Sequence, residues 1–146
     1  MEVARNRLAA GRFVRAVLRG LRKGEAWAKR DRDLAGADIN DVAALTAAFK
    51  GPEGVFVIVP PNFDPSPEFR EARAIAATVS STLDAARPGK VVYLSTIGAQ
   101  ATYSNLLSQH TIIEQSLRKL SLPITFLRPG RLIWQFILEW RRGRRS

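Results

Sequence analysis

The run from Val55 to Val59 (VFVIV), ended by Pro60 and Pro61, is the feature that most restricts how this chain can fold. An uninterrupted apolar run of this kind is typical of a central parallel strand that is covered on both faces. Parallel strands are joined by crossover helices, which also cover the sheet. The run therefore predicts an α/β domain.

In the rest of the sequence, strand-like segments alternate with helix-like ones, as expected of an α/β domain. Glycine, proline, asparagine and aspartate divide it into short apolar segments and longer amphipathic ones. The predicted strands are 13–18, 34–39, 55–59, 90–96 and 124–127, and the predicted helices are 2–10, 42–49, 68–86 and 105–120. Asn40 or Asp41 is placed to cap the helix at 42–49. We expect a doubly wound, Rossmann-like parallel sheet, with ligands bound outside the carboxyl ends of its strands.

The size and composition suit a single domain. The chain has 146 residues, of which 46% are apolar, enough for one core. It has no cysteine, which excludes disulfides and a thiolate metal site, and we predict no metal ligands. No apolar stretch approaches the roughly 20 residues of a membrane helix. We therefore expect a cytoplasmic protein without a transmembrane segment.

The formal net charge of +10 suggests nucleic acid as a partner, but the charge is unevenly distributed. Residues 1–36 carry ten Lys and Arg against four Asp and Glu, residues 131–146 carry five against one, and residues 37–130 carry eight against eight. The middle of the chain is neutral, so we do not expect it to bind nucleic acid. The alternative is a basic module whose Arg-rich ends bind nucleic acid or an acidic membrane surface.

Four segments at the predicted strand ends are specific enough to indicate a family. They are VRAVLR (14–19), ADINDVAALTAAFKGPEGVFVIVPP (37–61), GKVVYLSTIGAQ (89–100) and SLPITFLRPG (121–130). In this order and spacing they resemble the NmrA-like branch of the atypical short-chain dehydrogenase/reductase proteins. The resemblance implies a partial NAD(P)-binding domain at 1–130, followed by an atypical basic and apolar tail at 131–146.

The resemblance implies a site for the adenosine half of NADP. In this family a basic residue that ends the second strand contacts the 2′-phosphate; it falls on Arg19, with Lys23 as a second cation. A guanidinium suits this role because its planar fork can make two charge-assisted bonds. Asp38 and Ile39 match the position at the adenine edge. The alternatives are a solvated surface role for Arg19 and a helix-capping role for Asp38.

The other implied cofactor contacts lie at the ends of later strands. Pro60 and Pro61 match the loop that passes the ribose and diphosphate, and Ser95, Thr96 and Ile97 match the strand end beside the nicotinamide. The alternative for these residues is that they stop a strand and form a turn.

The chain departs from the wider superfamily at the residues that transfer protons. A Tyr-x-x-x-Lys pair serves there as acid/base, whereas Leu106 and His110 align with those two positions here. His110, the only histidine, is a weak candidate for a ribose contact or a proton donor, and its alternative is a structural role on a helix. Several NmrA-like proteins bind dinucleotides as sensors. Catalysis is therefore not assured, and any activity would be that of an NAD(P)-dependent oxidoreductase.

The glycine-rich loop that receives the cofactor diphosphate is also missing. The ten glycines include no G-x-G pair, and residues 2–11 resemble the end of the family's first helix. In the usual strand order 3-2-1-4-5, the strand before that helix joins the two halves of the sheet. We therefore expect unpaired edges or a new pairing at strands 13–18 and 55–59, and a marginal fold.

The tail RLIWQFILEWRRGRRS (131–146) is unlike the family as well. Trp134, Phe136, Ile137 and Trp140 could cover the sheet, contact a membrane surface or promote association. The interpretation we favour is unselected sequence beyond a truncation or a shifted reading frame.

Together these observations predict a truncated or degenerate NmrA-like protein, a redox sensor or reductase-like. We expect it to bind NADP, or NAD, weakly or not at all. Self-association through unpaired strand edges or the apolar tail is a further expectation. An active reductase would need a first strand supplied by a partner chain.

Overall fold

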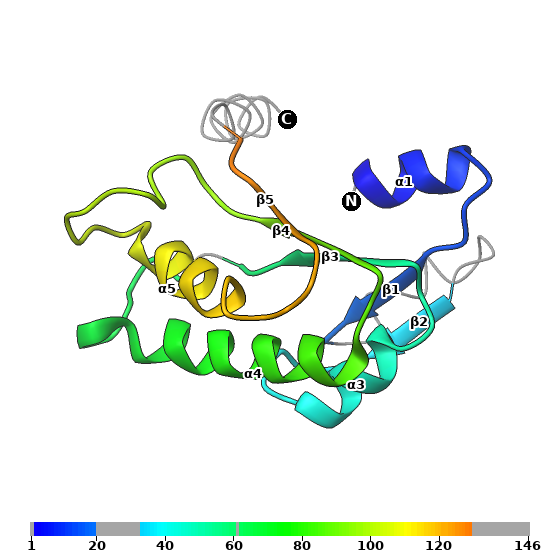
Figure 1. Ribbon diagram of the computed structural model, residues 1–146, viewed down its shortest axis with the longest axis horizontal. Helices are drawn as coiled ribbons and strands as arrows, with labels where there is room; N and C mark the ends of the chain where they lie inside the picture. The colour runs from blue at the N-terminus through cyan, green and yellow to red at the C-terminus, as the bar shows by residue number, and fades with distance from the viewer. Residues whose placement is uncertain (1, 20–32, 61, 130–146) are drawn as a thin grey trace, which may run out of the picture.

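The computed structural model describes residues 2–19, 33–60 and 62–129 (Figure 1). In chain order the elements are α1 (Glu2–Ala9), β1 (Arg15–Leu18), β2 (Asp33–Gly36), α3 (Val42–Phe49), β3 (Gly54–Ile58), η2 (Pro67–Phe69), α4 (Arg70–Ala86), β4 (Lys90–Leu94), α5 (Ser108–Leu117) and β5 (Ile124–Leu127). The predictions made for Lys23, for Pro61 and for the tail 131–146 fall outside the described residues.

The described strands form two separate parallel sheets. β1 pairs with β2, with Arg15 opposite Asp33. β3, β4 and β5 pair in that order, with Val57 opposite Tyr93. In the part of the chain that the structure describes, neither β1 nor β3 has a second neighbour, in agreement with the unpaired edges expected at these two strands. Self-association through those edges stays a prediction.

The three-stranded sheet carries the core on one face. Val55 and Val57 of β3 and Val91 and Tyr93 of β4 are buried in one cluster with residues of α4 and α5. Figure 1 shows α3, α4 and α5 on the same side of the strands. On the opposite face Ile58 is 54% exposed. Among the described residues, the cover expected on both faces of the run 55–59 is incomplete at Ile58. The prediction of a central strand is wrong for the described sheet, in which β3 is an edge strand beside β4, because the strand expected on its other side is missing.

Helix α4 supplies the longest apolar stripe of the core. Ala72, Ala76, Val79 and Leu83 recur at helical spacing and are buried. The helix packs between α3 and α5, and the hydroxyls of Ser80 and Ser116 meet at 2.8 Å across the second of these contacts. Complete burial of a side chain such as that of Leu83 contributes about 1.5–3 kcal/mol. This helix therefore fixes the position of α5 above the sheet.

The predicted element bounds hold best where local signals are strong. The helix at 42–49 and the strand at 124–127 match α3 and β5 residue for residue. Helix α1 ends before Gly11, whose φ of 70° is the left-handed conformation that glycine adopts at helix ends. Strand β1 is shorter than predicted, and the Phe13 side chain before it is 74% exposed. Within the described ranges, no helix is both long and apolar enough to cross a bilayer.

Candidate functional site

The carboxyl ends of β1 and β2 bring together two residues predicted to hold the adenosine end of a dinucleotide. Arg19 directly follows β1, and Asp38 lies two residues beyond β2. Because paired parallel strands end at the same edge, the Arg19 Nε lies 4.0 Å from the Asp38 Oδ2. The two side chains are 80% and 43% exposed. An ion pair this exposed contributes little to stability, so both groups remain accessible to a ligand.

Asp38 also orders the loop that leads to α3. Its Oδ1 accepts hydrogen bonds from the backbone N–H of Asn40 at 2.9 Å and from the Asn40 side-chain amide at 3.0 Å. The cap of α3 is Asp41, whose Oδ1 accepts from the Ala44 N–H at 2.9 Å. The capping role considered for Asp38 is therefore wrong, because its carboxylate turns back over the loop. Ile39 packs against the core, so its side chain has a structural role.

The loop after β3 is tied to α5 by a buried amide. Pro60 is exposed, one residue beyond the buried Val59. The Gln109 Oε1 accepts from the Asn62 N–H at 3.1 Å, and the Gln109 Nε2 donates to the carbonyls of Asn62 at 3.4 Å and Leu106 at 3.2 Å. This contact fixes the loop close to the helix that carries His110.

The three residues predicted beside the nicotinamide differ in their accessibility. Ser95 is 3% exposed, and its hydroxyl donates to the Glu114 Oε1 at 2.6 Å. Thr96 is half-buried and its hydroxyl donates to the carbonyl of Ile97 at 3.2 Å. The Ile97 residue is 49% exposed. A ligand at this strand end could therefore contact Thr96 and Ile97, whereas the Ser95 side chain belongs to the interior.

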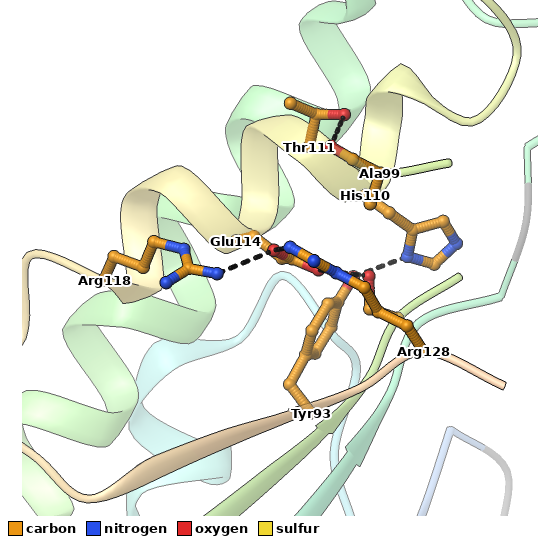
Figure 2. A network of polar contacts seen from close by, with 8 residues as sticks. Tyr93, Ala99, His110, Thr111, Glu114, Arg118 and Arg128 are labelled. Atoms are coloured by element: carbon orange, nitrogen blue, oxygen red, sulfur yellow. Dashed lines mark hydrogen bonds and ion pairs between the residues drawn. The ribbon is translucent and has the colours of Figure 1, made fainter. Parts of the chain in front are cut away.

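His110 forms a buried pair with Tyr93. Its Nδ1 lies 2.7 Å from the Tyr93 hydroxyl oxygen, and Tyr93 and His110 are 0% and 9% exposed. Burial lowers the pKa of His110 against the opposing influence of the Glu114 charge, so the imidazole is neutral near pH 7. Burial and the Glu114 charge both raise the pKa of Tyr93. In Figure 2 the second ring nitrogen of His110 points away from Tyr93, where it could meet a ligand.

A carboxylate with three partners, the Glu114 cluster, lies beside this pair: Glu114, Ser95, Arg118 and Arg128. The Glu114 side chain is 4% exposed. Arg128, at the end of β5, donates from Nε to Oε1 at 2.8 Å and from Nη2 to Oε2, and Arg118 donates to Oε2 at 3.3 Å. Figure 2 shows the two guanidinium groups reaching the carboxylate from different sides. The buried charge is thus paired and hydrogen-bonded, as burial requires.

Hydrogen bonds within the Glu114 cluster stabilise the ionised form of the Glu114 carboxylate. Burial alone would raise the pKa of Glu114, but hydrogen bonds from Arg128 and Ser95 outweigh it, and the net effect lowers that pKa. The same carboxylate raises the pKa of Arg128. Glu114 is therefore ionised at neutral pH and is a poor proton donor.

Two surface hollows lie away from the predicted cofactor contacts. The larger, about 590 Å³, lies against α5 and the loop after β4. The other, about 390 Å³, lies between the two-stranded sheet and α3, beside Arg15 and Ala48. None of the residues predicted to bind the cofactor lines either hollow.

Four residues of these polar groupings were not among the predicted site residues: Tyr93, Glu114, Arg118 and Arg128. One local signal was available, since Glu114 and Arg118 follow His110 at intervals of four residues and so share a helix face. Arg128 closes the segment ITFLR, but nothing local indicates that β5 carries it to Glu114. The structure thus shows two groupings, the accessible pair at β1 and β2 and the buried polar residues at β4, β5 and α5.

No protein-family model matches the sequence, and no curated protein matches it significantly. Solved structures do resemble the fold. An NADPH-dependent quinone oxidoreductase of Escherichia coli, solved with NADPH, is 28% identical with a TM-score of 0.66, and the match covers 80% of this chain and 39% of that one. A Citrobacter triphenylmethane reductase, solved with NADP(H), is 24% identical with a TM-score of 0.69, covering 78% and 39%.

A nucleoside-diphosphate-sugar epimerase from Staphylococcus aureus shares the fold at 14% identity and a TM-score of 0.66, over 78% of this chain and 40% of that one. This chain therefore spans about two fifths of the length of these proteins. The fold is the Rossmann-like α/β fold of NAD(P)-dependent reductases and epimerase-like proteins. The first two structures were solved with NADPH or NADP(H) bound.

Proposed function

We propose that this chain is an NmrA-like NAD(P)-binding protein that senses the dinucleotide rather than using it to transform a substrate. The observation that carries the proposal is the meeting of Arg19 and Asp38 at the ends of neighbouring strands. The guanidinium would hold the 2′-phosphate of NADP through two charge-assisted bonds, and the carboxylate would accept from the exocyclic amine of adenine. Lys23 would add a second cation.

The residues fit one end of the cofactor and not the other. Arg19 and Asp38 are exposed donors and acceptors of the kind that the adenosine phosphate needs. The ten glycines of the sequence include no G-x-G pair, so no glycine-rich turn is available to bind the diphosphate. Pro60, Thr96 and the outward nitrogen of His110 would make the remaining contacts. Such a site binds weakly and prefers NADP to NAD, because most of its charge faces the 2′-phosphate.

Sensing is the better proposal because the proton-transfer groups are absent or buried. A bound NADPH would supply hydride chemistry. The Ser95 hydroxyl is held by Glu114, Leu106 stands at the tyrosine position, and Tyr93 has a raised pKa and no exposed surface. We also propose that the open edges of β1 and β3 promote self-association. The alternative function is a basic module whose Arg-rich ends, residues 1–36 and 131–146, bind nucleic acid or an acidic membrane surface. Much of these two segments lies outside the described residues.

Calorimetric titration of the whole chain with NADPH and with NADH tests the proposal. We expect NADPH to bind more tightly, and Arg19→Ala to weaken NADPH about tenfold or more while leaving NADH unchanged, since a bond to a charged group contributes roughly 1.5–3 kcal/mol. Arg12→Ala is the matched control, because Arg12 is an exposed arginine at the other end of β1. Equal binding of NADPH by wild type and Arg19→Ala would refute the proposal. Salt-sensitive DNA binding that is lost on removing residues 141–146 would favour the basic module instead.

A further inference from the structure

The larger hollow is separate from every residue assigned to the dinucleotide. Its volume of about 590 Å³ is in the usual range for small-molecule sites. The loop Ala99–Ser104 forms one wall, and α5 forms another. Phe69, at the end of η2, and Arg73, in the first turn of α4, close a third side. A hydrogen bond from the Thr111 hydroxyl to the Ala99 carbonyl at 2.7 Å holds the loop against α5 (Figure 2).

The lining of this hollow carries more positive than negative charge. Arg73, Arg118 and Arg128 are its three cations, and Glu114 is its single carboxylate. Arg128 is engaged with Glu114 through two nitrogens, so that pair is neutral. Arg118 gives Glu114 only one contact, at 3.3 Å, and Arg73 gives it none. Three guanidinium groups against one carboxylate leave the described lining with a net charge of +2, because Arg118 shares Glu114 with Arg128 and Arg73 has no carboxylate partner among the described residues.

The two arginines are positioned while keeping donors free. The Arg73 Nε donates to the Glu68 carbonyl at 2.9 Å, and its two terminal nitrogens have no partner within the described ranges. The Arg118 guanidinium lies 4.5 Å from the centre of the Phe126 ring, a cation–π contact that orients the plane of the group. Fixed guanidinium planes with unused N–H groups recognise carboxylate and phosphate oxygens through paired bonds.

The other lining residues favour a ligand with an apolar part. Phe69 and Ile112 are half-buried apolar side chains of the wall. Ser104 and Gln115 also line it, and their side chains have no hydrogen-bond partner within the described ranges. An inorganic ion would leave the apolar wall in water, whereas an organic anion would cover it.

We propose that this hollow is a binding site for a small organic oxyanion, a carboxylate or a phosphate ester with an apolar body, held by Arg73 and Arg118. The hollow shares none of the residues proposed to hold NADP, although Glu114 in its lining accepts a hydrogen bond from Ser95. We therefore expect both ligands to bind at once.

NMR titration of the whole chain with phenyl phosphate, benzoate and inorganic phosphate tests this proposal. We expect phenyl phosphate or benzoate to bind at least tenfold more tightly than inorganic phosphate, with shifts at Ser104, Ile112 and Gln115, and the tighter of the two identifies the preferred head group. Arg73→Ala should weaken that binding about tenfold. This variant leaves the Glu114 cluster intact, so its folding is not at risk.

Three controls make the outcome decisive. Lys119→Ala removes an exposed cation next to Arg118 that does not line the hollow, and it should bind the probe like wild type. Arg19→Ala should also leave the probe affinity unchanged, even if it abolishes NADPH binding. Unchanged affinity in both Arg73→Ala and Arg118→Ala would overturn the proposal, and so would loss of probe binding in Arg19→Ala or on saturation with NADPH. Failure of NADPH to bind at all would count only against the dinucleotide site.

Discussion

The two sheets of this protein differ in how deeply their strand residues are buried. In the sheet β3-β4-β5, Val57, Val91 and Tyr93 are buried against α4 and α5, and hydrogen bonds connect the interior. In the sheet β1-β2 every strand residue is half-buried or exposed. There Arg15 forms the main side-chain link, donating to the Asp33 Oδ2 at 2.5 Å and to the carbonyl of Ala48 at 3.1 Å.

The ion pairs of the two sheets, Arg15–Asp33 and Arg128–Glu114, therefore contribute differently to stability. The Glu114 side chain is 4% exposed, whereas that of Asp33 is 39% exposed. Water stabilises Asp33 whether or not Arg15 is present, but Glu114 depends on its protein partners. The larger sheet therefore carries most of the stability, and the smaller sheet presents Arg19 and Asp38 at the surface.

The largest expected effect comes from truncating a buried side chain in the core of the three-stranded sheet. Leu83→Ala should lower the free energy of unfolding by about 2–5 kcal/mol, because the side chain is fully buried and leaves a cavity. Leu18→Ala in β1 should cost about 1 kcal/mol or less, since Leu18 is only half-buried. Urea unfolding measures both. Equal losses would mean that the two sheets share one core.

Removing the arginine of each ion pair should again destabilise the larger sheet more than the smaller one. The difference in the free energy of unfolding should be smaller than for the leucine variants. Arg128→Ala leaves a buried carboxylate short of its best partner and should cost about 1.5–3 kcal/mol. Arg15→Ala should cost less than about 1 kcal/mol, because its partner is partly solvated. Adding Glu114→Gln to Arg128→Ala should restore part of the loss by removing the buried charge. A double variant less stable than Arg128→Ala would contradict this account.

The smallest expected effect is a dependence of stability on pH that belongs to the larger sheet. The pKa of His110 is lowered from 6.5 by burial, so the unfolded chain binds a proton first and stability falls as the pH drops below about 6.5 towards the native pKa. Glu114, whose pKa is lowered from 4.5 mainly by Arg128 and Ser95, adds a second loss below about pH 4.5. Unfolding midpoints between about pH 8 and pH 2 measure both.

The variant His110→Gln separates these two steps. Because His110 is the only histidine in the sequence, this change should remove the loss that begins below about pH 6.5 and leave the loss below about pH 4.5. A loss that persists unchanged in the variant would show that His110 does not titrate as described.

Much of the fold could be predicted because it depends on local signals. The apolar helix 42–49 has a capping aspartate before it, and ITFL lies between Pro123 and Arg128, so both elements were predicted without error. The separation of β1 from β3 also agreed with the expectation from the missing first strand. The run 55–59 was predicted to be a central strand covered on both faces, but β3 lies at the edge of the described sheet and Ile58 is 54% exposed. An apolar run does not show which strands or helices lie beside it.

Local patterns were enough to predict the α/β class, the strand segments and the placement of Arg19 and Asp38 at strand ends. Each of these depends on residues that are neighbours in the chain or on the rule that parallel strands end together. Three contacts could be found only after folding: Ser95 turns inward, His110 meets Tyr93, and Arg128 reaches Glu114. These contacts join segments 14 to 19 residues apart, and their chemistry depends on burial, which raises or lowers a pKa only after the segments have packed.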